Sequence, residues 1–131
     1  MKYILMMTGT KANFDGYAKW PKEDLRRNVA FMRAFSKELN DSGVLVSTVG
    51  LAFPDQAKIV RAGSEGEPVT DGVFPESKEF LAGYWIVDVE TPERAYEIAA
   101  RISGAPGPGG LALGMPIEVR RVMSGPPEEL L

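Results

Sequence analysis

The sequence predicts a single α+β domain in which two helices lie on one face of a β-sheet. Its length of 131 residues is typical of one domain and leaves little room for a second core. Two segments carry apolar residues at helical spacing, and β-rich segments lie before, between and after them. The predicted order is β-α-β-β, an irregular segment, and then β-α-β. Because crossover connections are right-handed, both helices should lie on the same side of the sheet.

The composition narrows the classes of function. A net charge of −3, with Lys and Arg spread along the chain, gives no basic face for nucleic acid. The absence of cysteine and histidine excludes disulfides, thiolate nucleophiles, imidazole metal ligands and Ser-His-Asp or Cys-His catalysis. An enzyme built from this chain would have to use Asp, Glu, Lys, Tyr, Arg or an external cofactor. We expect neither a cofactor nor a metal site.

The hydropathy of the chain predicts a cytoplasmic protein that does not bind membranes. No apolar run approaches the roughly 20 residues of a membrane-spanning helix. Residues 1–7 are mostly apolar but too short for the apolar region of a signal peptide. They predict a buried first strand instead.

The N-terminal part of the chain predicts a strand, an aromatic loop and a long helix. The strand covers residues 2–8, and residues 9–20 are expected to form a loop whose aromatic side chains anchor it. The helix should begin at Pro21 and stop at residues 41–43. Its buried face is predicted from apolar residues at three- and four-residue steps, which are Leu25, Val29, Met32, Phe35 and Leu39.

The middle of the chain predicts three strands. Residues 44–51 and 56–62 are β-rich, and residues 52–55 between them resemble a short hairpin connection. Residues 81–90 form a strong strand with two largely buried faces. One face is expected to carry Trp85, Val87 and Val89, and the other Tyr84, Ile86 and Asp88.

The last third of the chain predicts a helix, a loop and a closing strand. Thr91 is a good N-cap, and the helix after it carries an apolar stripe. Residues 103–114 form a Gly/Pro-rich loop, and residues 116–123 alternate as a strand. The domain is therefore expected to cover residues 1–123, with a loosely held tail at 124–131.

One face of the predicted sheet has no helix to cover it. That face carries Trp85 or Tyr84, depending on register, together with Glu118 and Arg120. A large half-apolar sheet face on so small a protein is usually buried against a partner. We therefore expect a homodimer.

The segment from residue 69 to residue 85 is the most distinctive part of the chain. It contains Val-Thr-Asp-Gly-Val-Phe-Pro-Glu-Ser-Lys-Glu and then Leu-Ala-Gly-Tyr-Trp. This resembles the signature of the YCII-related (DGPF-domain) family, which has Asp-Gly-Pro-Phe, a Glu and a Lys-Glu pair before a Gly-Tyr strand. Val73 stands where the family usually has Pro. The likeness includes the opening Met-Lys-Tyr, the Glu-Leu-x-x-Ser-Gly helix end at 38–43 and Glu-Val-Arg at 118–120, so it covers nearly the whole chain.

The resemblance implies a ferredoxin-like antiparallel sheet with two helices on one face, paired into a dimeric α+β barrel with a pocket near the motif. The family has no established general activity. Its DGPF-type members are often encoded beside, or fused to, extracytoplasmic-function sigma factors, which implies a functional link to such a factor. Some relatives carry a His-Asp arrangement proposed as catalytic, and this chain cannot form it because it has no histidine.

The candidate ligand-binding residues are the charged residues of the motif and one cation of the closing strand. Carboxylates held near cations could position a small polar or anionic ligand, and an aromatic side chain could form an apolar wall. The charged candidates are Asp71, Glu76, Lys78, Glu79 and Arg120. The candidate walls are Trp20 and Tyr84.

Two plainer interpretations apply to the same residues. Asp71 followed by Gly72 can form an ordinary turn, because Asp bonds its own following amides and Gly tolerates unusual dihedral angles. Glu118 and Arg120 lie on the same side of a strand, where they can form a cross-strand ion pair instead of a ligand clamp.

Two functions from different classes are consistent with the sequence. The first is a small-molecule-binding or regulatory module without enzymatic activity. The second is a cofactor-independent enzyme of the dimeric α+β barrel type, monooxygenase- or isomerase-like, that uses carboxylates in place of His. The sequence does not decide whether the protein is an enzyme.

Overall fold

The computed structural model describes residues 1–72 and 78–130 of the chain. Its strands are β1 (Lys2–Thr10), β2 (Leu45–Gly50), β3 (Lys58–Ala62), β4 (Pro68–Gly72), β5 (Glu79–Asp88) and β6 (Ile117–Arg121). Its α-helices are α1 (Lys11–Ala18), α2 (Lys22–Asp41) and α3 (Pro92–Ser103). Three short 3₁₀ helices are η1 (Pro54–Gln56), η2 (Pro108–Gly110) and η3 (Glu128–Leu130). No helix in the described ranges is both long and apolar enough to cross a membrane.

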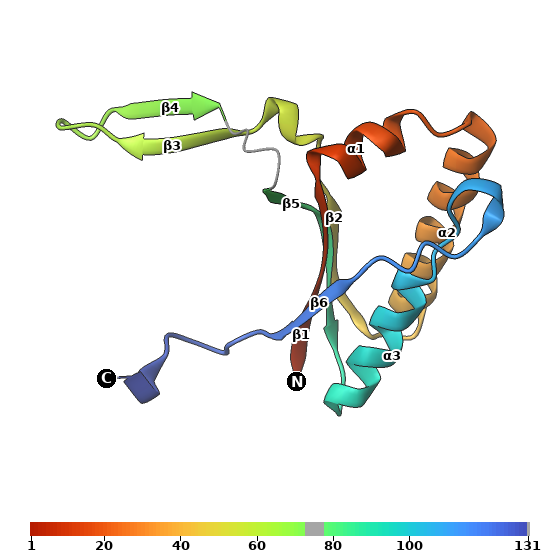
Figure 1. Cartoon of the computed structure of the whole chain (residues 1–131). Coiled ribbons are helices and arrows are strands. Elements are labelled where there is room, and N and C mark those ends of the chain that lie inside the picture. The colour runs from red at the N-terminus through yellow and green to blue at the C-terminus, as the bar shows by residue number, and fades with distance from the viewer. Residues whose placement is uncertain (73–77, 131) are drawn as a thin grey trace.

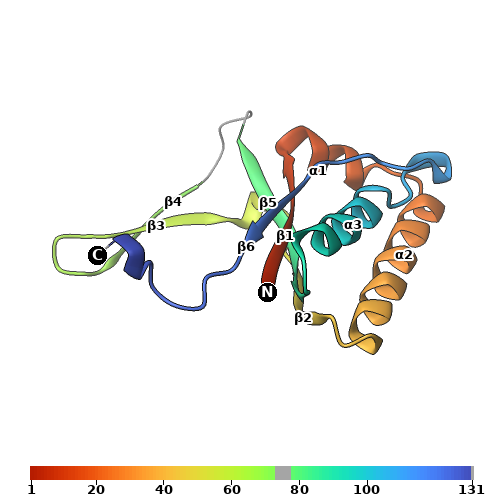
Figure 2. The ribbon, with the colours of Figure 1, turned by 90° about the horizontal axis from the view of Figure 1, so that it is seen from below.

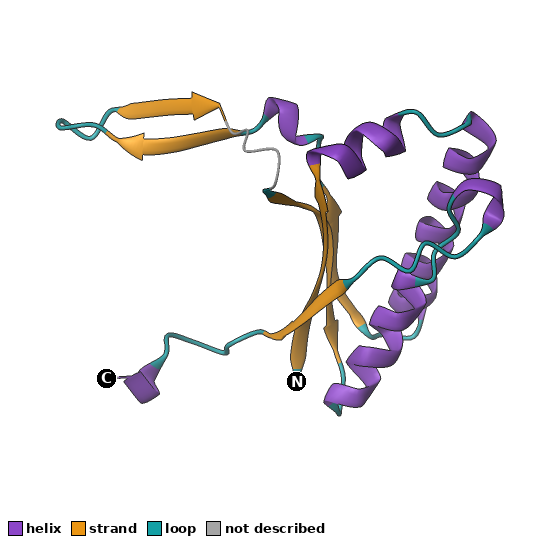
Figure 3. Ribbon diagram, viewed as in Figure 1, coloured by secondary structure: helices purple, strands orange, loops and turns teal. Residues whose placement is uncertain are grey.

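The predicted α+β architecture is confirmed. Four strands form one sheet in the order β2-β5-β1-β6, and every neighbouring pair is antiparallel. The sheet is open and does not close into a barrel, with β2 and β6 at its edges. Helices α2 and α3 both cover the same face, as the right-handed crossovers require (Figures 1 and 3).

Strands β1 and β5 form the centre of the sheet because both of their faces are apolar. Leu5 pairs with Trp85 and Tyr3 with Val87, and these four side chains are buried on the helix side. The alternation predicted for residues 84–89 is therefore correct. A bulge between Met7 and Thr8 interrupts the register at the other end of the pair.

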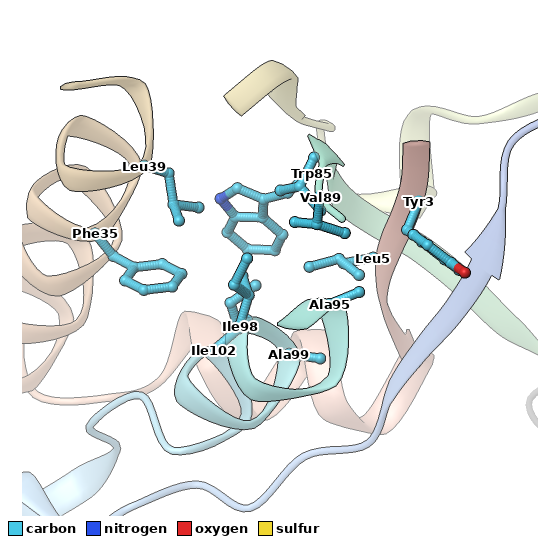
Figure 4. Close-up of a cluster of buried hydrophobic side chains, with 11 residues drawn as sticks. Tyr3, Leu5, Phe35, Leu39, Trp85, Val89, Ala95, Ile98, Ala99 and Ile102 are labelled. Carbon is cyan, nitrogen blue, oxygen red and sulfur yellow. The ribbon is translucent and has the colours of Figure 1, made fainter. Parts of the chain in front are cut away.

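The hydrophobic core lies between the helices and the sheet (Figure 4). Leu5, Leu39, Val87, Ile98 and Ile102 are its most deeply buried large side chains. The apolar stripe of α3 is confirmed, and Thr91 caps that helix by accepting a hydrogen bond from the amide of Arg94. The core therefore fixes how both covering helices sit on the sheet.

An arginine on α3 joins the two covering helices outside the core. Arg101 donates hydrogen bonds to both carboxylate oxygens of Glu38 on α2, at 2.7 and 3.1 Å. Its guanidinium also lies over the ring of Phe35, 4.4 Å from the centroid. A bidentate pair with a stacked aromatic ring holds the two helices in one relative orientation.

Helix α2 has the predicted bounds but only part of the predicted buried face. Gly43 ends it in the left-handed region with φ of 78°, and Phe35 and Leu39 are buried. In its first half, however, Val29 is exposed while Asp24 and Asn28 are buried. The prediction was wrong there because the Gly/Pro-rich loop, and not the sheet, covers the start of the helix.

Two polar side chains of α2 hold that loop. The side-chain amide of Asn28 donates to the carbonyl oxygen of Pro106 at 3.0 Å. The carboxylate of Asp24 accepts from the amide of Gly109 at 3.2 Å and from Arg27 at 3.1 Å. Buried polar groups are stable only when paired in this way.

Residues 9–20, predicted as a loop, contain helix α1. Thr10 and Asn13 form a capping box, in which each side chain bonds the backbone of the other. None of the helix residues is buried, so the apolar periodicity that identifies a helix is weak there. The aromatic residues do anchor the segment, because Phe14 and Tyr17 contact the ring of Phe53 at centroid distances of 5.6 and 6.3 Å.

The predicted hairpin through residues 52–55 is also wrong. Strand β2 pairs with β5, whereas β3 pairs with β4 in a separate two-stranded sheet. The polar turn around Gly66, with φ of 82°, closes this second hairpin. The β3–β4 arm projects from the side of the sheet opposite the helices, as does the C-terminal segment (Figure 2).

Candidate functional site

A cleft of about 400 Å³ lies between helix α2 and the β2–β5 edge of the sheet. We call it the α2 cleft. Its lining is mainly apolar, with Met7 from β1, Met32 from α2 and Trp85 from β5 among the contributing residues. Trp85 is held in position because its indole N–H donates to the hydroxyl oxygen of Ser36 at 3.2 Å. The α2 cleft falls within the size range of small-molecule sites.

Two paired glycines form part of the cleft wall. Gly50 and Gly83 lie opposite each other in the β2–β5 pair, and both line the cleft. A Cβ atom on Gly83 would come within 2.7 Å of the carbonyl oxygen of Val49, so a side chain there would force the strands to shift. The two glycines leave the sheet without side chains where the cleft is open.

The polar groups of the cleft are mostly hydrogen-bond donors. Arg33 is exposed on α2 and makes no hydrogen bond or ion pair with any residue that the structure describes. The Ser36 oxygen accepts from Trp85, which leaves its hydroxyl hydrogen free to donate. The Thr48 hydroxyl instead donates to the carbonyl oxygen of Tyr84 at 2.9 Å. No Asp or Glu is among the described residues that line the cleft.

The motif residues predicted as a site lie elsewhere. Asp71 is on β4 and forms an exposed ion pair with Arg61 at 3.3 Å. The ammonium group of Lys78 lies 5.1 Å from the ring centroid of Phe80. Glu79 is exposed at the start of β5, opposite Thr10. Glu76 falls outside the described residues.

Arg120 and the two aromatic candidates occupy three further positions. Arg120 lies 3.9 Å from Glu118 in an exposed ion pair within β6, and not in the cross-strand pair of the plainer interpretation. The ring of Trp20 packs against that of Tyr17 at 4.9 Å. Tyr84 faces away from the helices. None of the described candidates lines the α2 cleft.

The structure therefore brings the predicted site residues into separate local pairs. Among the described residues, no hydrogen bond or ion pair joins Asp71, Glu79 and Arg120 to one another. Their convergence in one partly enclosed pocket stays a prediction.

The face of the sheet opposite the helices is apolar at its centre. Alternation along β1 and β5 places Ile4, Met6, Tyr84 and Ile86 there, each partly buried. Met6 lies between Tyr84 and Glu118 in the register, and Ile4 lies between Ile86 and Arg120. We call this surface the open sheet face. It combines a hydrophobic centre with one charge of each sign at the β6 edge.

The residues that sequence reasoning missed are Arg33, Ser36 and Gly50. Arg33 and Ser36 lie three residues apart on α2 and so share one side of the helix, next to the buried face. That spacing was visible in the sequence. The pairing of Gly50 with Gly83 was not, because it depends on a register between distant strands.

Shifted pKa values occur at residues outside the α2 cleft. Burial raises the pKa of the Tyr17 phenol. The hydrogen bonds from Arg101 lower the pKa of Glu38, with a smaller contribution from the positive charge of Arg101 itself. In the described ranges, no group of three or more acidic residues is arranged to hold a metal ion. The features of the cleft are thus shape, apolar surface and unpaired donors.

These features define a small α+β protein with one helix-covered sheet face, one open face and a cleft beside its longest helix. A profile of the YCII-related domain matches residues 1–109. A protein of Rhizobium meliloti (strain 1021), described as uncharacterized, is 30% identical over 87 residues, which cover 66% of this chain and 69% of that protein. The chain belongs to the YCII-related family, as its motif predicted.

Proposed function

We propose that this YCII-related protein is a homodimeric small-molecule-binding module whose ligand occupies the α2 cleft. The observation that carries the proposal is the combination of apolar lining with Arg33, which has no partner among the described residues, in a cleft of about 400 Å³. An arginine that lacks a protein partner beside an apolar surface is suited to hold a ligand group. The cleft is built on α2, β2 and β5, so its walls are rigid elements.

The open sheet face supports the homodimer. Strand order β2-β5-β1-β6, with two crossover helices on one side, agrees with the ferredoxin-like pattern. Two such sheets packed face to face would form the dimeric α+β barrel that the family resemblance implies. Opposite charges at Glu118 and Arg120 suit a two-fold interface, because each copy offers both signs to the other.

A dimer also gives the predicted motif residues a role. The β3–β4 arm with Asp71 extends on the same side as the open sheet face, which carries Tyr84 and Arg120 (Figure 2). A second copy bound to the open sheet face would enclose these side chains. A regulatory role, including the link to a sigma factor, rests on the family resemblance.

The enzymatic alternative receives no support from the cleft. Carboxylate-based catalysis requires an Asp or Glu beside the substrate, and none is among the described residues of the α2 cleft. Binding is therefore the function that the cleft chemistry favours.

A thermal-shift screen against a metabolite library tests the binding function, because a ligand that binds only the folded protein raises its melting temperature. Compounds that stabilise the protein are then tested on Thr48→Phe, which adds a ring at the cleft, and on Thr70→Phe, the same change on the exposed β4 strand. We expect stabilisation to be lost in Thr48→Phe and kept in Thr70→Phe. Equal stabilisation of both variants would place the ligand outside the cleft and refute the proposal.

A further inference from the structure

We propose that the α2 cleft selects ligands with a carboxylate group attached to an apolar chain or ring. This inference rests on the proposed binding function and adds the chemical class of the ligand. The argument uses the polar atoms of the cleft, their existing partners and the charges around them.

The cleft contains hydrogen-bond donors that have no acceptor among the described residues. Arg33 presents a guanidinium with five N–H donors and no acceptor among the described residues. Ser36 lies one helical turn away on the same side of α2; its oxygen accepts from Trp85, and its hydroxyl hydrogen has no acceptor among the described residues. The hydroxyl hydrogen of Thr48 is already donated to Tyr84. A ligand group that only accepts hydrogen bonds fits this donor set better than one that donates.

The positive charge of Arg33 is not neutralised by an acidic residue one turn away on its own helix. Positions three and four residues away, where an acid would neutralise it, hold Val29, Ala30, Ser36 and Lys37. Glu38 is already bound by both nitrogens of Arg101, and Lys37 is paired with Asp41. A carboxylate matches the planar fork of an arginine and would supply the missing negative charge.

The rest of the cleft requires an apolar ligand body. Met7, Met32 and Trp85 are among the residues that line the cleft, and these side chains cannot satisfy polar groups on a ligand. An anion without an apolar body would leave this surface in contact with water. The ligand class is therefore an amphiphile with one acidic end.

Octanoate, octan-1-ol and octylammonium test the class because they share one apolar chain and differ in the charge of the end group. The binding site is identified from the indole N–H signal of Trp85 in ¹⁵N–¹H NMR spectra, since Trp85 lines the cleft. We expect octanoate to shift this signal and to bind about tenfold more tightly than octan-1-ol, with octylammonium weakest. Arg33→Gln should remove this preference by weakening octanoate about tenfold while leaving octan-1-ol unchanged.

Arg26→Gln is the matched control, since Arg26 is an exposed arginine of the same helix outside the cleft. A second variant, Ser36→Ala, should weaken octanoate about threefold or more by removing one donor. Equal binding of octanoate and octan-1-ol at Trp85 would overturn the carboxylate class and leave the binding function intact. Failure of all three probes to bind there, while library compounds bind in a Thr48→Phe-sensitive way, would also overturn the class alone. Failure of both the probes and the library would overturn the binding function as well.

Discussion

Replacement of Asp24 by alanine should destabilise the protein, although the sequence pattern marks this residue as an ordinary surface acid. Asp24 is 9% exposed and accepts hydrogen bonds from Gly109 and Arg27. Alanine removes the acceptor and leaves the amide of Gly109 unpaired beside the start of α2. The Gly/Pro-rich loop would then lose one of its two polar anchors.

The expected cost follows from these two bonds. A hydrogen bond to a charged acceptor in a partly buried site is worth about 1.5–3 kcal/mol. The pair with Arg27, whose side chain is 41% exposed, adds at most about 1 kcal/mol. We therefore expect a loss of about 1.5–4 kcal/mol. With an unfolding entropy of about 2.1 cal/mol/K per residue over 131 residues, the melting temperature should fall by about 5–15 °C.

Differential scanning calorimetry measures this shift, with three comparisons. Asp24→Asn keeps an acceptor oxygen and should lose about half as much. Asp15→Ala, an exposed acid of α1, should change little. In Asp24→Ala the amide of Gly109 should also exchange faster with solvent, whereas the amide of Leu113, which donates to Ala105, should not. A fall in melting temperature below 2 °C, or an equal fall in Asp15→Ala, would refute the reasoning.

Three further predictions concern charge and assembly. The pKa of Glu38 is lowered by Arg101, so its stabilising contribution is present above the ordinary Glu value of 4.5 and is lost as pH falls through the lowered folded-state pKa. Acid titrations followed by circular dichroism should therefore show a shallower loss of stability in Glu38→Gln than in the parent protein. Burial raises the pKa of Tyr17, so its contribution to stability is complete below the ordinary value of 10.0 and is lost as pH rises through the raised folded-state pKa. Tyr17→Phe should therefore lose less stability at alkaline pH than the parent protein. Identical curves of stability against pH for the two proteins would contradict this. Finally, Ile86→Glu on the open sheet face should convert a dimer to a monomer in light scattering, whereas Leu111→Glu, at an exposed position of the Gly/Pro-rich loop, should not. A monomeric parent protein would count against the dimer.

The parts of the fold that could be predicted from the sequence are those with strong local signals. Strand β5 and helix α3 each have a clear apolar period, and Thr91 marks the boundary between them. Helix α1 lacks such a period, and its Phe14 and Tyr17 rings contact Phe53 of a neighbouring loop. A capping box that ends in Asn instead of the usual Glu or Gln was an insufficient signal.

Strand pairing was the main fold-level error, and its cause is physical. Two β-rich segments joined by four residues normally form a hairpin, because short connections favour adjacent pairing. Here β2 instead completes the edge of the main sheet beside β5, where its residue Leu45 pairs with Val87 of the core. The hydrophobic gain from that long-range pairing does not appear in any local window of the sequence.

The candidate site was predicted from charge, whereas the cleft depends on shape. The motif acids and cations form exposed local pairs such as Asp71 with Arg61. The cleft lies where Gly50 pairs with Gly83 and where Arg33, without a partner in the part of the chain that the structure describes, borders an apolar surface. Neither feature can be predicted from composition, because both depend on how distant elements pair and pack.

The β3–β4 arm lies within the connection from β2 to β5. Gly50 pairs with Gly83, and the amide of Leu51 donates to Ala82 at 2.8 Å, so the sheet is already registered at the point where the chain leaves it. The pairs of β1 with β5 and β6 fix the remaining register without any contribution from the arm. Shortening a loop lowers its closure entropy, so a short flexible linker in place of the arm should leave the sheet intact. The sheet and its helices should therefore tolerate changes in the length of the arm.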